Sequence, residues 1–388
     1  MIQKNKMKKL PIGKQEFKGL IEGDFIYVDK TSYLVSLAES TIPIFLSRPR
    51  RFGKSLMVIN TFKELFKGNK ELFQNTYAYN HWDFQQIHPV IRLNLSQVVG
   101  DTAQAVEKQL YELIREQAED FNLTLTEKSA ANIAFRQLIK QIGREKPVVV
   151  LIDEYDAPVL DNLQNPNLLE IKKVLRGFYK IIKASEEYIR FVFITGSSKF
   201  THVGIFSALN NLEDITLSSE YASILGYTEK EIAAFFPQQI HLAKEQIDLT
   251  EKLFWKKMAA YYNGYSWDGE HFVYNPLSIL KFFRSKGKFI PYWMETGSPE
   301  YIIRYSKDKQ FDITDFEQLK VSDSFLSKRD IDNASPESFL TQAGYLTIKK
   351  SEEGSYTLDF PNQEVRRSFC ELILNVQYAV ADADSAEK

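Results

Sequence analysis

The stretch Ile44-Phe45-Leu46-Ser47 followed by Arg48-Pro49-Arg50-Arg51-Phe52-Gly53-Lys54-Ser55 decides the fold class of this chain. Its first three residues are apolar and β-prone, which predicts a short buried strand. From Ser55 onward, apolar residues recur near helical spacing as far as Gly68, a residue type that is common at helix C-termini. The eight residues 48–55 therefore join a strand to the N-terminus of a helix, where unpaired backbone amides and the helix dipole favour an anion.

This arrangement predicts a loop that binds the phosphates of a nucleotide. Gly53 lets the backbone approach a phosphate, Lys54 can reach the β- and γ-phosphates, and the Ser55 hydroxyl would bind Mg²⁺. We expect ATP as the nucleotide and Mg²⁺ as its metal. The residues expected to surround the nucleotide are Pro49, Arg50, Arg51, Phe52, Gly53, Lys54, Ser55 and Leu56.

One position departs from the usual loop pattern G-x-x-x-x-G-K-S/T, because its first glycine falls on Arg48. The loop must then make its turn with a side chain at this position, which puts the usual loop geometry in question. A solvated basic turn containing Arg48, Arg50 and Arg51 is the alternative interpretation.

A second motif lies about a hundred residues downstream, where the apolar run 148–152 ends in Asp153-Glu154. Lys146-Pro147 argues against a helix that continues through this run, so we predict a strand buried on both faces. Ligands bind at the carboxyl ends of strands in open α/β sheets. Asp153 is then placed to hold Mg²⁺, directly or through water, and Glu154 to orient an attacking water. The alternative is that residues 153–156 form an ordinary acidic loop or helix cap.

A third apolar run, Phe191-Val192-Phe193-Ile194, ends in Thr195-Gly196-Ser197-Ser198 and predicts another strand of the same sheet. A polar residue at such a strand end can sense the γ-phosphate. We favour Thr195 for this role and keep Ser197 as its alternative; capping of the following segment is a further interpretation. The predicted catalytic residues are thus Lys54, Glu154 and Thr195, and the predicted metal ligands are Ser55 and Asp153.

With these motifs in place, the chain resembles the AAA-ATPase-like proteins of gut and oral anaerobic bacteria, many of which carry a C-terminal nuclease of the PD-(D/E)xK type. The matching stretches run in order along nearly the whole chain: 27–31, 46–56, 151–158, 195–200, 205–212, 225–228, 262–265, 274–276, 344–347 and 361–365. Arginine in the place of the first loop glycine is itself part of this family's pattern.

The resemblance implies an α/β fold: a P-loop NTPase core of the additional-strand type with a parallel sheet, then a helical lid and a small winged-helix-like module. We place the N-terminal lead-in at 1–43, the ATPase core at 44–218, the lid at 219–309 and the winged-helix-like module at 310–375. Residues 376–388 are expected to form a disordered tail. A nuclease of the PD-(D/E)xK type needs an Asp and a downstream Glu-x-Lys; no such pair follows Pro361, so we expect the nuclease to be absent here.

Local patterns fill in this outline. We predict a strand at 90–95, helices at 101–118 and 127–142, and a capped helix start at Thr228. Strands at 345–349 and 356–360 suggest the hairpin of a winged helix. Aromatic residues at 261–262 and 265–267 are more often core or interface than base-stacking platforms. The lead-in residues 10–13 and Phe17 either pack against the adenine side of the site or simply join the core.

Composition agrees with a globular chain: 388 residues, 44% hydrophobic, with a net charge of −2 that gives no long-range attraction to nucleic acid or anionic membrane. The single cysteine, Cys370, excludes an internal disulfide, and the five histidines show no metal-ligand spacing. No run approaches the roughly 18 apolar residues of a membrane span, so we expect a cytoplasmic protein without a membrane partner. The sequence leaves open whether the protein forms a homo-oligomer. Binding of nucleic acid would depend on a local basic patch. The candidate patch is Lys172, Lys173, Arg176 and Lys180, for which a solvated helix face is the alternative.

Two functions of different class follow. The first is an ATP-dependent conformational switch that hydrolyses ATP; the second is a nucleotide-binding scaffold that has lost turnover. Glu154 favours the first, because a site without catalysis has no need of an acid beside the metal ligand. An ATPase subunit of a nucleic-acid-processing or defence system is a third option that rests on relatives alone.

Overall fold

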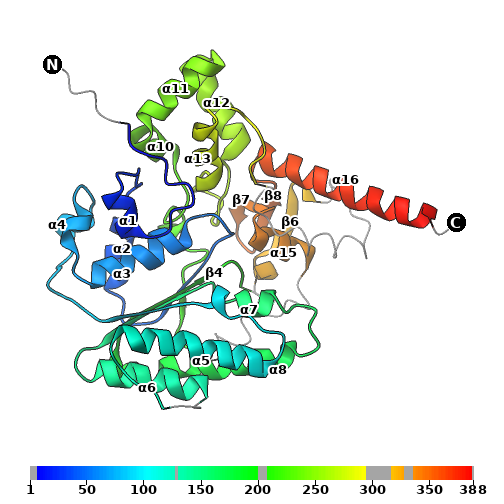
Figure 1. Cartoon of the computed structure of the whole chain (residues 1–388). Helices are drawn as coiled ribbons and strands as arrows, with labels where there is room; N and C mark the ends of the chain where they lie inside the picture. Colours follow the sequence, from blue (N-terminus) through cyan, green and yellow to red (C-terminus); the bar gives the residue numbers. More distant parts are fainter. Residues whose placement is uncertain (1–6, 127–129, 200–207, 294–315, 327–334, 387–388) are drawn as a thin grey trace, which may run out of the picture.

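The computed structural model describes residues 7–126, 130–199, 208–293, 316–326 and 335–386. Figure 1 shows a sheet-containing core, a group of lid helices above it, and a C-terminal module at its side, from which the last helix projects. The predicted division into an α/β core followed by a helical region is visible in this arrangement.

The core sheet has five parallel strands: β1 (Ile44–Ser47), β2 (Val90–Asn94), β3 (Val148–Asp153), β4 (Ile189–Gly196) and β5 (Glu213–Asp214). Their order across the sheet is β2-β3-β4-β1-β5. Strand β4 therefore lies between β1, which leads into the predicted phosphate loop, and β3, which ends in Asp153. This is the additional strand that the family resemblance implied, and the fold class is confirmed.

The sheet is buried on both faces, which explains the continuous apolar runs in its strands. Alternate side chains point to opposite faces. Ile44, Leu46, Val149, Leu151, Phe191 and Phe193 join one apolar cluster, whereas Phe45, Val148, Val150, Ile152, Val192 and Ile194 join the other.

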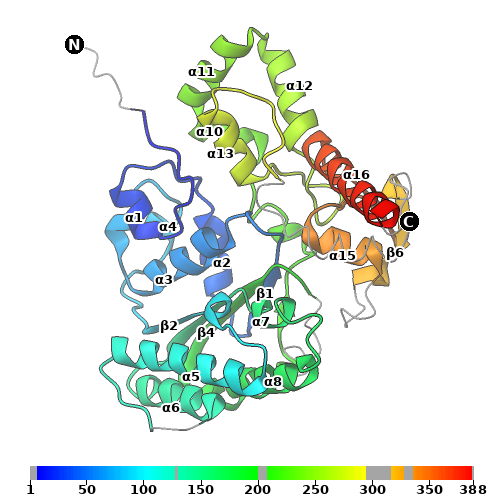
Figure 2. The same cartoon turned by 45° about the vertical axis from the view of Figure 1, so that its right-hand side comes forward.

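Helices α5 (Ala103–Asp120), α6 (Ala131–Gly143) and α8 (Leu168–Ala184) cover one face. Helices α1 (Phe17–Glu22), α2 (Thr31–Ala38) and α3 (Thr61–Phe66) cover the other, as Figure 2 shows. The helix predicted after Ser55 begins as a π-helical segment, Lys54–Asn60, continues as α3 and is followed by Gly68 with a φ of +74°. In the lead-in, Leu10 and Ile12 pack against the first cluster.

The lid consists of α10 (Glu229–Phe235), α11 (Pro237–Ile247), α12 (Glu251–Tyr262) and α13 (Pro276–Arg284). Helix α10 starts with the predicted cap: the Thr228 hydroxyl accepts from the backbone N–H of Glu231, whose carboxylate accepts from the N–H of Thr228. Glu231 also forms an ion pair of 2.6 Å with the buried Lys30, which donates to the Ser223 carbonyl as well. Burial lowers the pKa of Lys30, and the Glu231 charge opposes that shift. This pair ties the lid to the lead-in.

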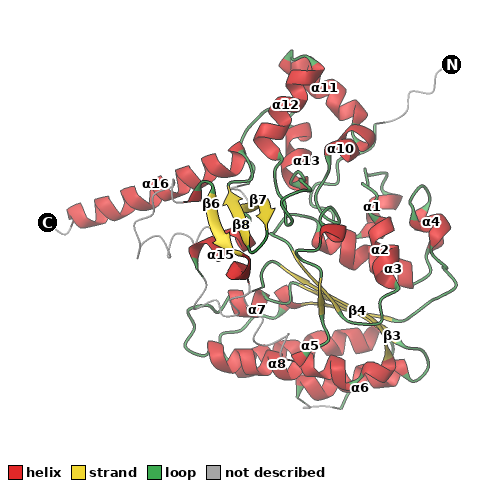
Figure 3. Ribbon diagram, turned by 180° about the vertical axis from the view of Figure 1, so that it is seen from behind, coloured by secondary structure: helices red, strands yellow, loops and turns green. Residues whose placement is uncertain are grey.

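The C-terminal module contains α15 (Pro336–Ala343), a three-stranded sheet and α16 (Gln363–Ala386). Strands β6 (Leu319–Ser322), β7 (Thr347–Glu352) and β8 (Ser355–Asp359) pair antiparallel in the order β6-β8-β7, seen from behind in Figure 3. The predicted hairpin is present, and Gly354 makes its turn with a φ of +75°.

The tail differs from the expectation of disorder at 376–388, because α16 continues as far as Ala386. Its sequence from 363 to 386 contains no glycine or proline that would end a helix, and several alanines favour it.

Short helical turns complete the described structure: 3₁₀ turns at Lys70–Phe73, Leu95–Gln97, Glu186–Tyr188, Ser219–Tyr221 and Asp323–Leu326, and short α-helices α4 (Ala78–His81) and α7 (Ala157–Leu160). Within the described part of the chain, no helix combines the length and the apolar character needed to cross a membrane.

A buried carboxylate joins the lid to the C-terminal module. Glu364, in the first turn of α16, accepts hydrogen bonds from the Ser278 hydroxyl (2.8 Å) and from the backbone N–H groups of Tyr292 (2.7 Å) and Trp293 (3.0 Å). Burial raises the pKa of Glu364 to about 7, against its ordinary 4.5, although these hydrogen bonds and the charge of Lys281 lower it. The junction is therefore most stable when Glu364 is protonated.

We expect the free energy of unfolding to depend on pH through Glu364. A folded-state pKa above the unfolded value means that stability is complete below about pH 4.5 and is lost as pH rises through about 7. Between about pH 8 and pH 5.5 the wild type should gain about 2 kcal/mol relative to Glu364→Gln, as urea denaturation would measure. The exposed Glu353→Gln is the control and should follow the wild type. Parallel pH profiles for wild type and Glu364→Gln would refute the assignment.

Candidate functional site

The candidate site lies where the carboxyl ends of β1, β3 and β4 meet. The ladder pairs Leu46 with Thr195 and Ser47 with Gly196, so the ends of β1 and β4 are level. Ile152 pairs with Ile194, one residue before Asp153. The loop after β1, the acidic pair after β3 and the polar segment after β4 consequently share one edge of the sheet.

The predicted phosphate loop makes its turn at Arg51 and Gly53, whose φ angles are +71° and +90°. The Lys54 ammonium donates to the carbonyls of Arg48 (2.9 Å) and Pro49 (3.2 Å), and its Nζ lies 3.7 Å from Glu154 Oε1. The backbone of the loop therefore surrounds the Lys54 ammonium. The fold also makes neighbours of Lys54 and Glu154, which are a hundred residues apart in sequence.

Asp153 and Ser55 are also brought together. Burial raises the pKa of Asp153, as does the nearby Glu154 charge, while a hydrogen bond from the Ser55 hydroxyl and the Lys54 charge lower it. Asp153 Oδ1 accepts from the backbone N–H of Glu154 (3.0 Å), and Glu154 has a φ of +47°. A hydroxyl, an ammonium and two carboxylates thus converge, which matches what a phosphate group and a divalent cation require.

The hydroxyls predicted as sensors are both engaged inside the protein. Thr195 is buried and its Oγ1 donates to the Leu46 carbonyl at 2.7 Å. The Ser197 hydroxyl donates to Asp156 at 3.0 Å. Thr195 thereby ties β4 to β1, and a sensor function for Thr195 stays a prediction.

Asp156 is a residue of this site that sequence reasoning did not single out. It is fully buried and accepts from the backbone N–H groups of Ser197 (3.1 Å) and Ser198 (2.8 Å) and from both of their hydroxyls. Burial and the Glu154 charge raise its pKa, and the serine hydrogen bonds lower it. The signal in the sequence was the spacing: an acid three residues past one strand end, facing a Gly-Ser-Ser past the next.

Tyr155 reinforces the same connection between the acidic loop and β4. Its backbone N–H donates to the Thr195 carbonyl (3.1 Å), and its hydroxyl donates to the Ser198 carbonyl (2.9 Å). A Cβ at Gly196 would overlap both Asp156 Oδ1 and the Tyr155 ring. Position 196 therefore requires glycine because the acidic loop packs directly on the strand end.

Arg48 is not part of a solvated basic turn, so that alternative is wrong for this residue. Its guanidinium is fully buried: Nη1 donates to the carbonyls of Ser47 (2.9 Å) and Thr216 (2.8 Å), and Nη2 donates to that of Tyr221 (3.2 Å). Burial lowers the pKa of Arg48 to about 9, while the charges of Asp214 and Asp268 raise it. Because the positive φ angles fall on Arg51 and Gly53, position 48 does not need a glycine.

The other predicted loop residues divide into two groups. Arg50 and Arg51 are exposed, as a solvated turn would require, and Gly53 and Ser55 are partly exposed. Pro49 and Phe52 are buried, and Leu56 packs against the first apolar cluster. The Phe52 ring packs edge-on against Tyr265 and Trp267, with centroids 4.9 Å and 5.4 Å away. The aromatic stretch 265–267 is thus core and interface, as predicted.

The basic residues of α8 lie on its outer face. Lys173, Arg176 and Lys180 are exposed and Lys172 is half-buried. Lys173 pairs with Glu170 at 2.6 Å. The predicted shared face exists, but part of its charge is neutralised within the helix.

The strand order defines a P-loop NTPase fold of the additional-strand class. A family model described as "Predicted AAA-ATPase" matches residues 11–206, and the chain belongs to this AAA-ATPase-like family.

A relative from Azotobacter chroococcum mcd 1, named "Uncharacterized protein in vnfD 5'region", is 41% identical over 379 residues, which cover 95% of this chain and 70% of the relative. Among solved structures, the Aeropyrum pernix ORC1 protein in complex with DNA matches with 11% identity and a TM-score of 0.33, over 88% of this chain and 91% of that one.

The packing at Gly196 gives a test of the site's geometry. We expect Gly196→Ala to reduce the free energy of unfolding by about 1–3 kcal/mol, because the added methyl must displace the acidic loop. Gly177→Ala in α8 is the matched control: a Cβ there meets no atom within 4 Å, and alanine favours a helix by about 1 kcal/mol. Urea denaturation of both variants should therefore give shifts of opposite sign. A Gly196→Ala variant as stable as the wild type would contradict the packing.

Proposed function

We propose that this chain binds ATP with Mg²⁺ and hydrolyses it, and that the nucleotide state changes the positions of the lid and the C-terminal module. The observation that carries the proposal is the pairing of Ser55 with Asp153 beside the pairing of Lys54 with Glu154. Membership of the AAA-ATPase-like family supports nucleotide binding in general. Hydrolysis, the metal and the switch are the parts that experiments must test.

The residues present fit a magnesium nucleotide. Ser55 and Asp153 offer the hydroxyl and carboxylate oxygens that Mg²⁺ prefers. Among the described residues, no group of three or more His, Cys, Asp or Glu side chains gathers into a metal cage. Phosphate oxygens and water would complete the ligand shell. Bound Mg²⁺ would neutralise charge on the phosphates.

Different side chains would then contribute to nucleotide binding and to hydrolysis. Lys54 can exchange the carbonyls of Arg48 and Pro49 for phosphate oxygens, because an ammonium has three donors that rotate freely. Glu154 has a partly exposed carboxylate at the site and can accept a proton from, and so orient, an attacking water. Arg50 and Arg51 are exposed on the loop and can neutralise phosphate charge. A sensor role for Thr195 requires its hydroxyl to exchange the Leu46 carbonyl for the γ-phosphate.

The first test concerns binding. Lys54→Ala removes the charge that faces the β- and γ-phosphates, so we expect the affinity for Mg²⁺-ATP to fall more than about tenfold, or about 1.4 kcal/mol, by calorimetry. Lys67→Ala, which removes an exposed lysine at the end of α3, is the control and should bind like the wild type. Unchanged affinity in a folded Lys54→Ala protein would reject the site.

The second test separates binding from hydrolysis. Glu154→Gln keeps the size of the side chain but removes the proton acceptor, so we expect ATP to bind normally and turnover to fall about a hundredfold or more. Glu145→Gln, an exposed position before β3, is the control for charge. If wild-type turnover is no faster than that of Glu154→Gln while ATP still binds, the chain is a nucleotide-binding scaffold instead.

A further inference from the structure

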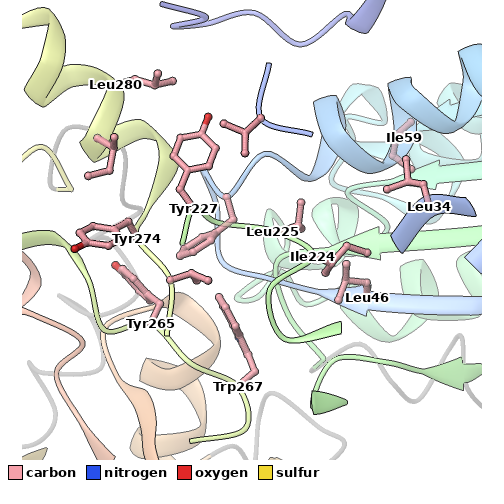
Figure 4. Packing of buried hydrophobic residues seen from close by; sticks show 14 of the residues in the cluster. Leu34, Leu46, Ile59, Ile224, Leu225, Tyr227, Tyr265, Trp267, Tyr274 and Leu280 are labelled. Atoms are coloured by element: carbon pink, nitrogen blue, oxygen red, sulfur yellow. The ribbon is translucent and has the colours of Figure 1, made fainter. Parts of the chain in front are cut away.

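The phosphate loop is held in shape from outside the core. Two of its side chains, Arg48 and Phe52, are buried against residues 265–268, the segment that follows α12 in the lid; we name this segment the lid strap. Figure 4 shows Tyr265 and Trp267 of the lid strap at the junction with the core, where Leu46 and Ile224 lie on the core side.

Trp267 contacts the loop at two places. The Arg48 guanidinium carbon lies 3.9 Å from the centre of the Trp267 ring, a cation–π arrangement in a desolvated environment. The Phe52 ring packs edge-on against the same indole at 5.4 Å, with an interplanar angle of 87°. One lid side chain thus lies against the first residue of the loop and against its apex.

The lid strap is itself fixed to the C-terminal module. The backbone N–H of Ser266 donates to Thr347 Oγ1 (2.7 Å), and this hydroxyl donates back to the Ser266 carbonyl (2.8 Å). Directly after the lid strap, Gly269 packs so closely on β7 that a Cβ there would lie 2.7 Å from the Ser351 nitrogen. The position of Trp267 therefore depends on the module as well as on the lid.

Arg48 connects this constraint to Lys54. Its carbonyl accepts from Lys54 Nζ at 2.9 Å, and its backbone N–H donates to the Gly196 carbonyl at 3.2 Å. A shift of Arg48 would change both the placement of the Lys54 ammonium and the connection to β4. The contacts run without a break from β7 through Trp267 and Arg48 to Lys54.

We propose that Trp267 is a positioning residue of the nucleotide site, which holds the phosphate loop through Arg48 and Phe52 and makes nucleotide binding and lid position depend on each other. The inference rests on the proposed function in one respect, that the loop binds ATP. It places a site residue well beyond residue 206, where the match to the family model ends. If a loop held by the lid binds ATP better, bound ATP must by linkage favour the same lid position.

The test uses the full chain and compares Trp267→Leu with Trp267→Phe. Leucine keeps an apolar side chain but lacks the π face, so the affinity for Mg²⁺-ATP should fall about tenfold in calorimetry. Phenylalanine keeps a ring and should restore part of that loss. The matched control is Trp255→Leu, which removes a half-buried lid tryptophan that packs edge-on against Phe254 in α12, and its affinity should stay within about twofold of the wild type.

A second readout separates positioning from mere stability. Adding ATP to the wild type should change tryptophan fluorescence, and Trp267→Phe should lose most of that change while Trp255→Leu keeps it. A Trp267→Leu protein that melts earlier but binds ATP with unchanged affinity would overturn the proposal. If Trp267→Leu does not fold, Arg48→Lys, which keeps the charge but not the planar guanidinium, should show the same loss of affinity.

The outcomes also distinguish this inference from the proposed function. A wild type that does not bind ATP rejects both. A wild type that binds ATP, with Trp267→Leu and Trp267→Phe binding equally well and giving the same fluorescence change, rejects only the positioning role.

Discussion

The insertion of β4 between β1 and β3 is the constraint on which the candidate site depends. Because β4 is hydrogen-bonded to both neighbours, its last residues can contact the phosphate loop on one side and the acidic loop on the other. Thr195 uses its hydroxyl on Leu46 of β1, and the carbonyl of the same residue accepts from Tyr155 after β3. A displacement at one loop can therefore reach the other through β4, as well as through the direct ion pair of Lys54 and Glu154.

Three buried ionisable groups lie where parts of this molecule meet. Lys30 joins the lead-in to the lid, Asp156 joins the acidic loop to β4, and Glu364 joins the lid to the C-terminal module. Burying a charge is costly unless hydrogen bonds compensate for it, and each of these groups has several. If one part of the molecule were displaced, the buried group would lose the hydrogen-bond partners that the other part supplies. These contacts therefore favour one arrangement of the parts.

Arg48 has a different structural role from the glycine that usually occupies its position in the phosphate-loop motif. In the usual loop the first glycine serves a backbone turn, but here the turn is made at Arg51 and Gly53. Position 48 is then free to carry a side chain, and its guanidinium reaches the Thr216 and Tyr221 carbonyls beyond β5 and the indole of Trp267. The departure from the pattern thus links the proposed nucleotide site to the rest of the chain.

The local sequence was enough to predict the main strands, a helix start and the motifs that we expect to lie nearest to the phosphates. The runs at 44–46, 148–152 and 191–194 are strands because their continuous apolar character suits a sheet buried on both faces, and the cap at Thr228 starts a helix because its hydroxyl satisfies a free N–H. Gly53-Lys54-Ser55 and Asp153-Glu154 were recognisable because their spacing from strand ends places them at one edge of the sheet.

Only the tertiary structure decided what Arg48, Asp156 and Trp267 do. Their partners lie 168, 42 and 219 residues away in sequence, at Thr216, Ser198 and Arg48, and no local pattern specifies such contacts. The tail was misjudged for a different, local reason: helix propensity in α16 outweighed the polar composition of its last residues. Composition and periodicity indicate whether a residue of a helix or strand is buried or exposed. They do not indicate which distant residue it contacts, because that contact forms only when the helices and strands pack together.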